Sequence, residues 1–115
     1  MGSLLFSLHG IRRILSRPES SKLIGDFVSM GLISRLDDVM RREKDPIIVL
    51  ESIWIISCLT TNTVACRALD KMLAYPSIIG CLTHRRILIT EKAVLAIGNL
   101  VSKRTETRDG LAEEV

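Results

Sequence analysis

The sequence predicts an all-α fold in which helices of different length follow one another in a repeated order. Aromatic residues make up only 3% of the 115 residues, so the core must come from aliphatic side chains, which suit packed helices better than a β-sandwich. Helix breakers divide the chain into amphipathic segments of about 10 to 16 residues. The order of these segments then recurs. With 47% hydrophobic and 25% charged residues, the composition is that of a single globular unit.

The first two predicted helices precede Gly31. Residues 4–16 form the first helix, which ends at residues 17–18 because proline disfavours the helical conformation in the residue before it. Its apolar residues at helical spacing are Leu5, Leu8, Ile11 and Leu15. A short second helix is expected to have Ser20 or Ser21 as its N-cap and to end before Gly31.

Two longer amphipathic or apolar segments follow. In residues 31–43 the predicted buried stripe consists of Leu32, Ile33, Leu36, Val39 and Met40. The side chains expected outside are Arg35, Asp37, Arg41 and Arg42. Asp45 is a typical N-cap with Pro46 at the first helical position, and the segment that they start is apolar nearly all round. We therefore expect this segment to lie between layers of the fold.

The same order of short, medium and long helices returns in the second half. The predicted helices are residues 62–73, residues 75–82 with Pro76 near the start, and residues 87–102. The tail, residues 105–115, resembles the opening of another short helix. These boundaries divide the chain into the last helix of a first repeat (4–17), a repeat at 19–62, a repeat at 63–103, and the start of a further repeat.

Internal periodicity supports the repeat. Superimposing LESIWIISCL on EKAVLAIGNL pairs Glu51 roughly with Glu91, Trp54 with Leu95 and Cys58 with Asn99. Cys58 and Asn99 are 41 residues apart, and LHGIRRIL places Arg13 at the same position 45 residues before Cys58. Helical units of about 40 to 47 residues are typical of armadillo and HEAT arrays. The recurrence therefore predicts an α-solenoid of the armadillo or HEAT type.

Asn99 and its neighbour Gly98 are unusual in an apolar helical run. Asparagine competes for its own backbone, and glycine costs roughly 1 kcal/mol against alanine in a helix interior. Residues spaced four apart on the long helices, such as Trp54 with Cys58, project from one surface. We therefore expect Asn99 to point into a groove lined by these helices, and the alternative is an interhelical hydrogen bond that fixes their register.

The chain resembles the N-terminal armadillo repeats of importin-α, the adaptor family that binds nuclear localisation signals. The matching stretches are ILSRPES, GLISRLDDVM, VLESIWIISCLTT and ITEKAVLAIGNLVSKRTETRD, and together they cover nearly the whole chain in order. In that family each third helix carries a Trp and, one turn later, an Asn. The Asn amide pairs with the backbone of an extended basic peptide, and the Trp rings receive Lys and Arg stems through cation–π contacts.

The resemblance implies an armadillo-repeat right-handed superhelix, an α-solenoid of about two complete repeats plus flanking helices. It also implies a role in nuclear protein import, in the cytoplasm and nucleus, with basic peptide segments of cargo proteins as partners. The implied peptide-binding residues are Trp54, Cys58, Leu95, Asn99, Glu51 and Glu91. The groove is partly degraded, because Cys58 replaces a family Asn and Leu95 a family Trp. Lys103 falls where the family has an acid and Lys92 where it has Gln, so both charges repel a basic peptide. Importin-β would bind through a segment that this chain lacks.

Two other functions compete with this interpretation. The first is a degenerate armadillo scaffold for protein–protein association, including self-association through exposed solenoid ends, without binding of peptide signals. The second is binding of phosphate or nucleic acid through Arg85, Arg86, Lys103 and Arg104, which predicts a steep salt dependence. The formal charge of +3 with interspersed signs makes nucleic acid a weak candidate.

The remaining patterns argue against an enzyme, a metal protein or a membrane protein. No nucleophile with its base, Gly-rich phosphate loop or carboxylate pair occurs, so neither catalysis nor a cofactor is expected. His9 lacks Cys or acidic partners at ligand spacing. Cys58, Cys66 and Cys81 lie in apolar surroundings and form no CxxC pair, so they are expected to be buried free thiols. No apolar run reaches 18 residues.

Overall fold

Helices form all the regular secondary structure in the computed structural model of the chain. It describes residues 2–17, 19, 21–71 and 75–114, with the side chains of 3–17, 19, 22–71 and 76–103. The elements are α1 (Gly2–Leu15), α2 (Ser21–Ser29), α3 (Leu32–Arg42), α4 (Pro46–Leu59), α5 (Thr63–Lys71), α6 (Tyr75–Gly80), the 3₁₀ turn η2 (Cys81–Thr83) and α7 (Ile87–Glu114). No strand occurs within these residues, and the predicted all-α class is confirmed.

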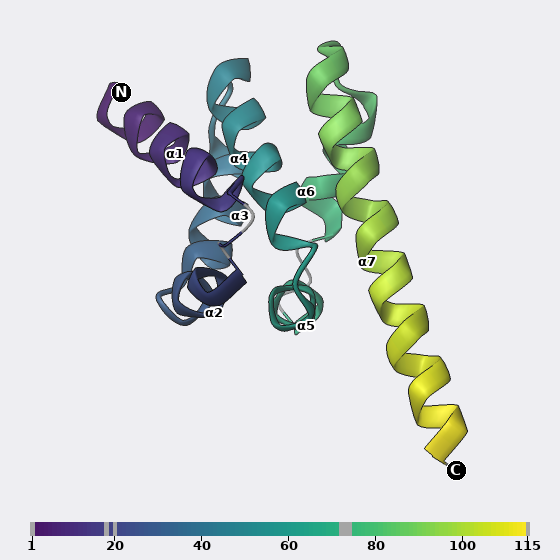
Figure 1. Cartoon of the computed structure of the whole chain (residues 1–115). Helices are drawn as coiled ribbons and strands as arrows, with labels where there is room; N and C mark the ends of the chain where they lie inside the picture. Colours follow the sequence, from purple (N-terminus) through teal and green to yellow (C-terminus); the bar gives the residue numbers. More distant parts are fainter. Residues whose placement is uncertain (1, 18, 20, 72–74, 115) are drawn as a thin grey trace.

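Helix α4 is the centre of the molecule. Its most extensive contacts are with α1 on one side and α7 on the other, so that these three helices lie side by side (Figure 1). Helix α3 packs against α4, and α6 with η2 packs against α7. Helices α2 and α5 contact each other at one end of the molecule. The central position explains why the sequence of α4 is apolar nearly all round.

The start of α4 forms as predicted. The Asp45 carboxylate oxygen Oδ1 accepts a hydrogen bond from the backbone N–H of Ile47 at 2.9 Å, and Pro46 occupies the first helical position. This capping satisfies one of the N–H groups that a helix start leaves without an intrahelical partner. The side chains of α4 that are almost fully buried include Ile53, Ile55 and Ile56.

Helix α3 confirms the predicted stripe with one difference. Ile33, Leu36 and Val39 are buried, whereas the flanking Leu32 and Met40 are partly buried. Gly31 precedes the helix with φ of 86°, a left-handed conformation that glycine adopts without steric cost. Asp37 is not a solvated outer residue as predicted, because it accepts a hydrogen bond from Ser77 Oγ at 2.6 Å and pairs with Arg41.

Helix α7 is longer than predicted. The sequence suggested a break after residue 103 and a separate short helix at 105–115, but α7 continues unbroken to Glu114. The stretch contains no proline, and Gly110 is its one strong helix breaker, so nothing in the backbone chemistry forces an end. The projecting end of α7 extends away from the rest of the molecule (Figure 1).

A few predictions concern residues that the structure does not describe. Pro18, Ser20 and residues 72–74 are among them, as are the side chains of Ser21 and Arg104. For the rest, the predicted burial of Leu8 and Leu15 in α1 is confirmed, and Leu5 and Ile11 are partly buried against the same core. No helix in the described part of the chain has the length and apolar character needed to cross a membrane.

Candidate peptide-binding site

Three of the predicted site residues lie along one side of α4. Glu51, Trp54 and Cys58 are spaced at i, i+3 and i+7, so their side chains project from the same stripe of the helix. Helix α1 lies beside this stripe, and Ser16 Oγ of α1 is 3.9 Å from the Cys58 sulfur. The stripe is therefore part of the boundary between α4 and its neighbours.

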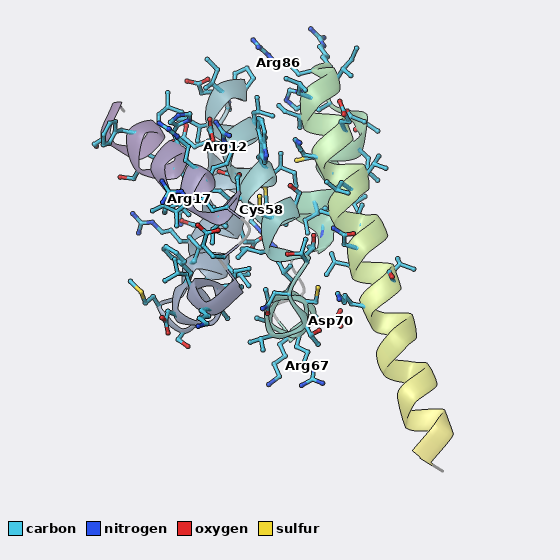
Figure 2. The ribbon with its side chains drawn as sticks, viewed as in Figure 1. Arg12, Arg17, Cys58, Arg67, Asp70 and Arg86 are labelled. Atoms are coloured by element: carbon cyan, nitrogen blue, oxygen red, sulfur yellow. The ribbon has the colours of Figure 1, made fainter. Side chains whose placement is uncertain are left out.

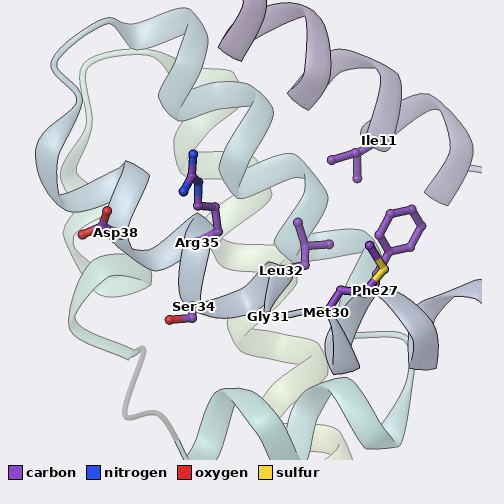
Figure 3. Close-up of a pocket in the computed structure, with 8 residues that line it drawn as sticks. All are labelled: Ile11, Phe27, Met30, Gly31, Leu32, Ser34, Arg35 and Asp38. Carbon is purple, nitrogen blue, oxygen red and sulfur yellow. The ribbon is translucent and has the colours of Figure 1, made fainter.

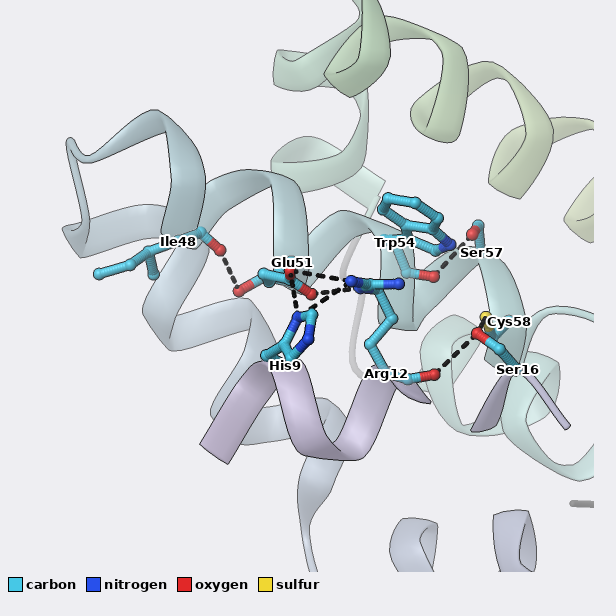
Figure 4. A network of polar contacts seen from close by, with 9 residues as sticks. His9, Arg12, Ser16, Ile48, Glu51, Trp54, Ser57 and Cys58 are labelled. Atoms are coloured by element: carbon cyan, nitrogen blue, oxygen red, sulfur yellow. Dashed lines mark hydrogen bonds and ion pairs between the residues drawn. The ribbon is translucent and has the colours of Figure 1, made fainter. Parts of the chain in front are cut away.

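Glu51 is buried in a polar network with α1 (Figure 4). Only 7% of the residue is exposed. The Arg12 guanidinium donates to both carboxylate oxygens, from Nε to Oε2 and from Nη2 to Oε1 at 3.3 Å. His9 Nδ1 lies 3.0 Å from Oε1 and also 3.0 Å from Arg12 Nη2, so it donates to Glu51 when protonated and accepts from Arg12 when not. The Glu51 carboxylate is therefore directed to α1 and is not a solvated surface charge.

The network also determines the protonation of Glu51. Burial by itself raises the pKa of this carboxyl, because a charge in a poorly solvated site is disfavoured. Hydrogen bonds from Arg12 and His9, together with their positive charges, outweigh burial and hold the pKa below its ordinary value. Glu51 is therefore an ionised carboxylate at neutral pH, already satisfied by side chains of its own chain.

The Trp54 ring is covered by two cations. The Arg12 guanidinium carbon lies 4.0 Å from the ring centroid and Lys92 Nζ of α7 lies 4.2 Å from it. Cation–π attraction is worth about 0.5 to 2 kcal/mol for each contact. Trp54 therefore connects all three neighbouring helices, α1, α4 and α7.

Asn99 binds to α4 across the boundary with α7. Its amide Nδ2 donates a hydrogen bond of 3.1 Å to Thr60 Oγ1, and Thr60 is fully buried. The Thr60 hydroxyl in turn donates to the carbonyl oxygen of Ser57 at 2.7 Å. Asn99 is partly buried, and its Oδ1 accepts no hydrogen bond from the described side chains or backbone. The amide Nδ2 thus fixes the register of α7 against α4, and Oδ1 has no hydrogen-bond partner among the described residues.

The other two predicted site residues lie on α7. Leu95 is 49% exposed and lies between Lys92 and Asn99 at i, i+3 and i+7 spacing, so it projects from the same side of the helix. Glu91 is exposed and directly precedes Lys92. The structure therefore brings Trp54 together with Glu51 and Cys58 on α4, and it places Leu95 and Asn99 on one side of the adjacent helix.

Sequence reasoning missed the partners of the site rather than the site itself. Arg12 and His9 lie 39 and 42 residues from Glu51 in the chain, and no local motif signals their pairing. His9 has no acidic partner at ligand spacing in the sequence, and its contact with Glu51 comes from a different helix.

The cysteines differ in their accessibility. All three are free thiols; Cys66 and Cys81 are buried as predicted, whereas Cys58 is only partly buried. Burial raises the pKa of the Cys66 and Cys81 thiols, which lowers the fraction of reactive thiolate.

We expect iodoacetamide to alkylate Cys58 before Cys66 and Cys81 in the native protein, as followed by peptide mass spectrometry. In denaturant the three cysteines should react at similar rates, which is the control for intrinsic reactivity. Labelling of either buried cysteine as fast as Cys58 in the native protein would contradict the burial assigned to them.

The predicted basic cluster is dispersed. Arg85 and Arg86 directly precede α7, and both are exposed. Lys103 follows Arg86 by 17 residues, which corresponds to about 26 Å along a helix. Figure 2 shows Arg86 near the end of the molecule where α7 begins, well separated from the exposed Arg67 of α5. Arginines and lysines at this separation do not form one phosphate-binding patch.

No group of three or more His, Cys, Asp or Glu side chains able to hold a metal occurs among the residues whose positions are described. Searches of protein-family models, curated proteins and solved structures found no match to this chain.

Proposed function

We propose that the chain is an importin-α-like armadillo unit that binds an extended basic peptide on the side of α4 and α7 that carries Trp54 and Asn99. The observation that carries the proposal is the Arg12 side chain itself. The Arg12 guanidinium carbon lies 4.0 Å from the centroid of the Trp54 ring while its nitrogens donate to the buried Glu51 carboxylate. An indole face with a carboxylate beside it is the chemistry that would receive a lysine or arginine of a signal peptide.

Asn99 supports the same proposal. Its Oδ1 has no partner among the described residues, so it is available to accept from a peptide N–H. An extended peptide must satisfy its backbone groups as well as its side chains. Asn99 and Lys92 are two helical turns apart on α7, and both reach towards α4, so a backbone contact and a side-chain contact would lie along one line.

The proposed site has a built-in competitor. Arg12 and Lys92 already lie against the Trp54 ring, so we expect a peptide side chain to displace one of them. Lys92 is the easier to displace, because it is partly exposed and forms no ion pair among the described residues, whereas Arg12 is held by Glu51. We therefore expect weak binding that is strengthened when the Lys92 charge is removed.

A titration with a fluorescent lysine-rich peptide, followed by anisotropy at low salt, tests the proposal. Lys92→Gln is expected to raise affinity about fivefold, since removing one repulsive charge near the site is worth roughly 1 kcal/mol. Asn99→Ala is expected to lower affinity by a similar factor through the loss of a hydrogen bond. Lys22→Gln serves as the control, because it removes the same charge from an exposed residue of α2, away from Trp54 and Asn99.

The outcome that rejects the proposal is equally specific. If neither the natural chain nor Lys92→Gln shows saturable binding at low salt, the site does not bind basic peptides. Thermal melting of each variant must accompany the titration, because Asn99→Ala also removes the hydrogen bond to Thr60.

A second candidate function, association with other helical proteins, is favoured by a separate observation. Helix α7 exposes a series of large apolar side chains: Ile87, Leu88, Val94, Leu95 and Val101. Monomeric proteins rarely leave continuous apolar stripes uncovered. Such a scaffold would bind its partner through these exposed apolar side chains of α7 rather than through Trp54.

A further inference from the structure

The side of α7 that faces away from α4, here called its outer flank, corresponds in the sequence superposition to a buried side of α4. Three residues of α4 and its C-cap, spaced at i, i+4 and i+7, are almost fully buried: Ile53, Ser57 and Thr60. Thr60 is in direct contact with α7 through Asn99. The residues 41 positions later are Val94, Gly98 and Val101. Here Val94 is 57% exposed, Val101 is 58% exposed, and Gly98 is exposed as well.

The outer flank of α1 shows the complementary relationship. Its residues Ser7, Gly10 and Ile14 are exposed or partly buried. Their counterparts 45 positions later, on the flank of α4, are almost fully buried: Ser52, Ile55 and Leu59. A further 41 positions on, the counterparts in α7 are buried too: Ala93, Ala96 and Leu100. Each of the three helices thus has two flanks that are equivalent from helix to helix. One flank of α1 and one flank of α7 remain open, and these two helices lie at opposite ends of the layer (Figure 1).

Each open flank contains a helical glycine that no packing contact with the described residues requires. A Cβ added to Gly10 or to Gly98 would meet no atom within 4 Å, so neither glycine is required for packing inside the molecule. Neither has a positive φ, so neither is required by the backbone. Glycine in a helix interior is destabilising, and close approach of another backbone is a common reason for retaining it.

We propose that these two flanks bind each other between copies of the chain, so that the Gly98 flank of α7 packs against the Gly10 flank of α1 in a second copy. The packing continues the arrangement in which α4 already lies against α7. The end of the molecule that carries α1 also has an open hollow of about 690 Å³, lined in part by Ile11, Phe27 and Met30 (Figure 3). The apolar surface available there is therefore larger than α1 alone.

The interface is head-to-tail, so it does not close on itself after two copies. A heterologous contact of this type produces rings or open chains. The proposal specifies the partner in the second candidate function, and it is independent of peptide binding at Trp54. A chain that stays monomeric yet binds a lysine-rich peptide would reject this inference alone.

Sedimentation of the whole chain across a concentration series tests the proposal, with glycine variants as probes. The weight-average mass of the natural chain should rise above the monomer mass of 12.8 kDa as concentration increases. Gly98→Gln and Gly10→Gln should each shift the association midpoint to at least about tenfold higher concentration. Because glutamine is a better helix former, the melting temperature of each monomeric variant should rise, by about 3 °C.

The matched control is Gly25→Gln in α2. A Cβ at Gly25 also meets nothing within 4 Å, but the residue lies on neither flank, so this variant should melt higher and associate like the natural chain. Loss of association in the control would attribute the effect to glutamine itself and overturn the proposal.

Mixing the two blocked variants determines the geometry. A head-to-tail contact requires that Gly98→Gln and Gly10→Gln, each weakly associating alone, form a one-to-one dimer when mixed, since one intact flank of each kind remains. If the natural chain is monomeric at all concentrations, or if the mixture stays monomeric, the proposed interface does not exist.

Discussion

Replacing Glu51 by glutamine is expected to lower the free energy of unfolding by about 2 to 3 kcal/mol at neutral pH. The substitution keeps the shape of the side chain but removes the charge that satisfies Arg12. Arg12 would then remain largely buried without its counter-charge, and removing one member of a buried ion pair is strongly destabilising. The effect should be measurable by chemical denaturation followed by circular dichroism.

The pH dependence of this loss has a definite sign. The pKa of Glu51 lies below its ordinary value of 4.5 in the folded protein, so between the two values the unfolded chain binds more protons than the folded one. The contribution of Glu51 to stability is therefore complete above about pH 4.5 and is lost as the pH falls through the folded-state pKa. The difference in stability between the natural chain and Glu51→Gln should shrink over this acidic range.

Glu91→Gln is the matched control, because the same substitution is made at an exposed position of α7. It should change the free energy of unfolding by less than about 0.5 kcal/mol. If Glu51→Gln were no more destabilising than this control, the network of Glu51 with Arg12 and His9 would have no energetic importance.

Truncating Ile53 to alanine is expected to destabilise the protein by about 3 kcal/mol. Ile53 is 0% exposed on the central helix and belongs to the hydrophobic core, so truncation would leave a cavity in that core. The structure around such a site can collapse only partly, which adds a cavity term to the lost transfer free energy. For a chain of this length the melting temperature should fall by about 12 °C.

Ile47→Ala provides the comparison within the same helix. Ile47 is 48% exposed, so the same chemical truncation removes less buried surface and should cost under about 1 kcal/mol. Similar melting temperatures for the two variants would show that α4 is not the centre of the core.

The helices were largely predictable because their signals are local. Asp45 followed by Pro46 identifies the start of α4, and the apolar spacing of Ile33, Leu36 and Val39 identifies the buried side of α3. The prediction was wrong at the end of α7, where a repeat pattern suggested a break that the backbone does not require. A pattern of repeats indicates where helices recur, whereas only capping or breaking residues determine where a helix ends.

The contacts of the site could not be predicted from the sequence alone. Trp54 and Asn99 were identified as exceptional residues, but their partners depend on how α1, α4 and α7 lie against one another. Arg12 reaches Glu51 and Trp54 together because the two are one turn apart on the side of α4 beside α1. Such pairing depends on helix separation and rotamers, which hydrophobic periodicity does not specify.

Hydroxyl groups in α4 donate their protons to its own backbone. Ser52 Oγ donates to the Ile48 carbonyl at 2.9 Å and Ser57 Oγ to the Trp54 carbonyl at 2.6 Å, and Thr60 behaves in the same way. Small polar residues can therefore be buried between helices without demanding a directional bond from the neighbouring helix. The directional contacts across the two boundaries are therefore few, and on the α4 side they converge on Glu51, Trp54 and Thr60. A change at one of these positions would loosen the neighbouring helix that it holds.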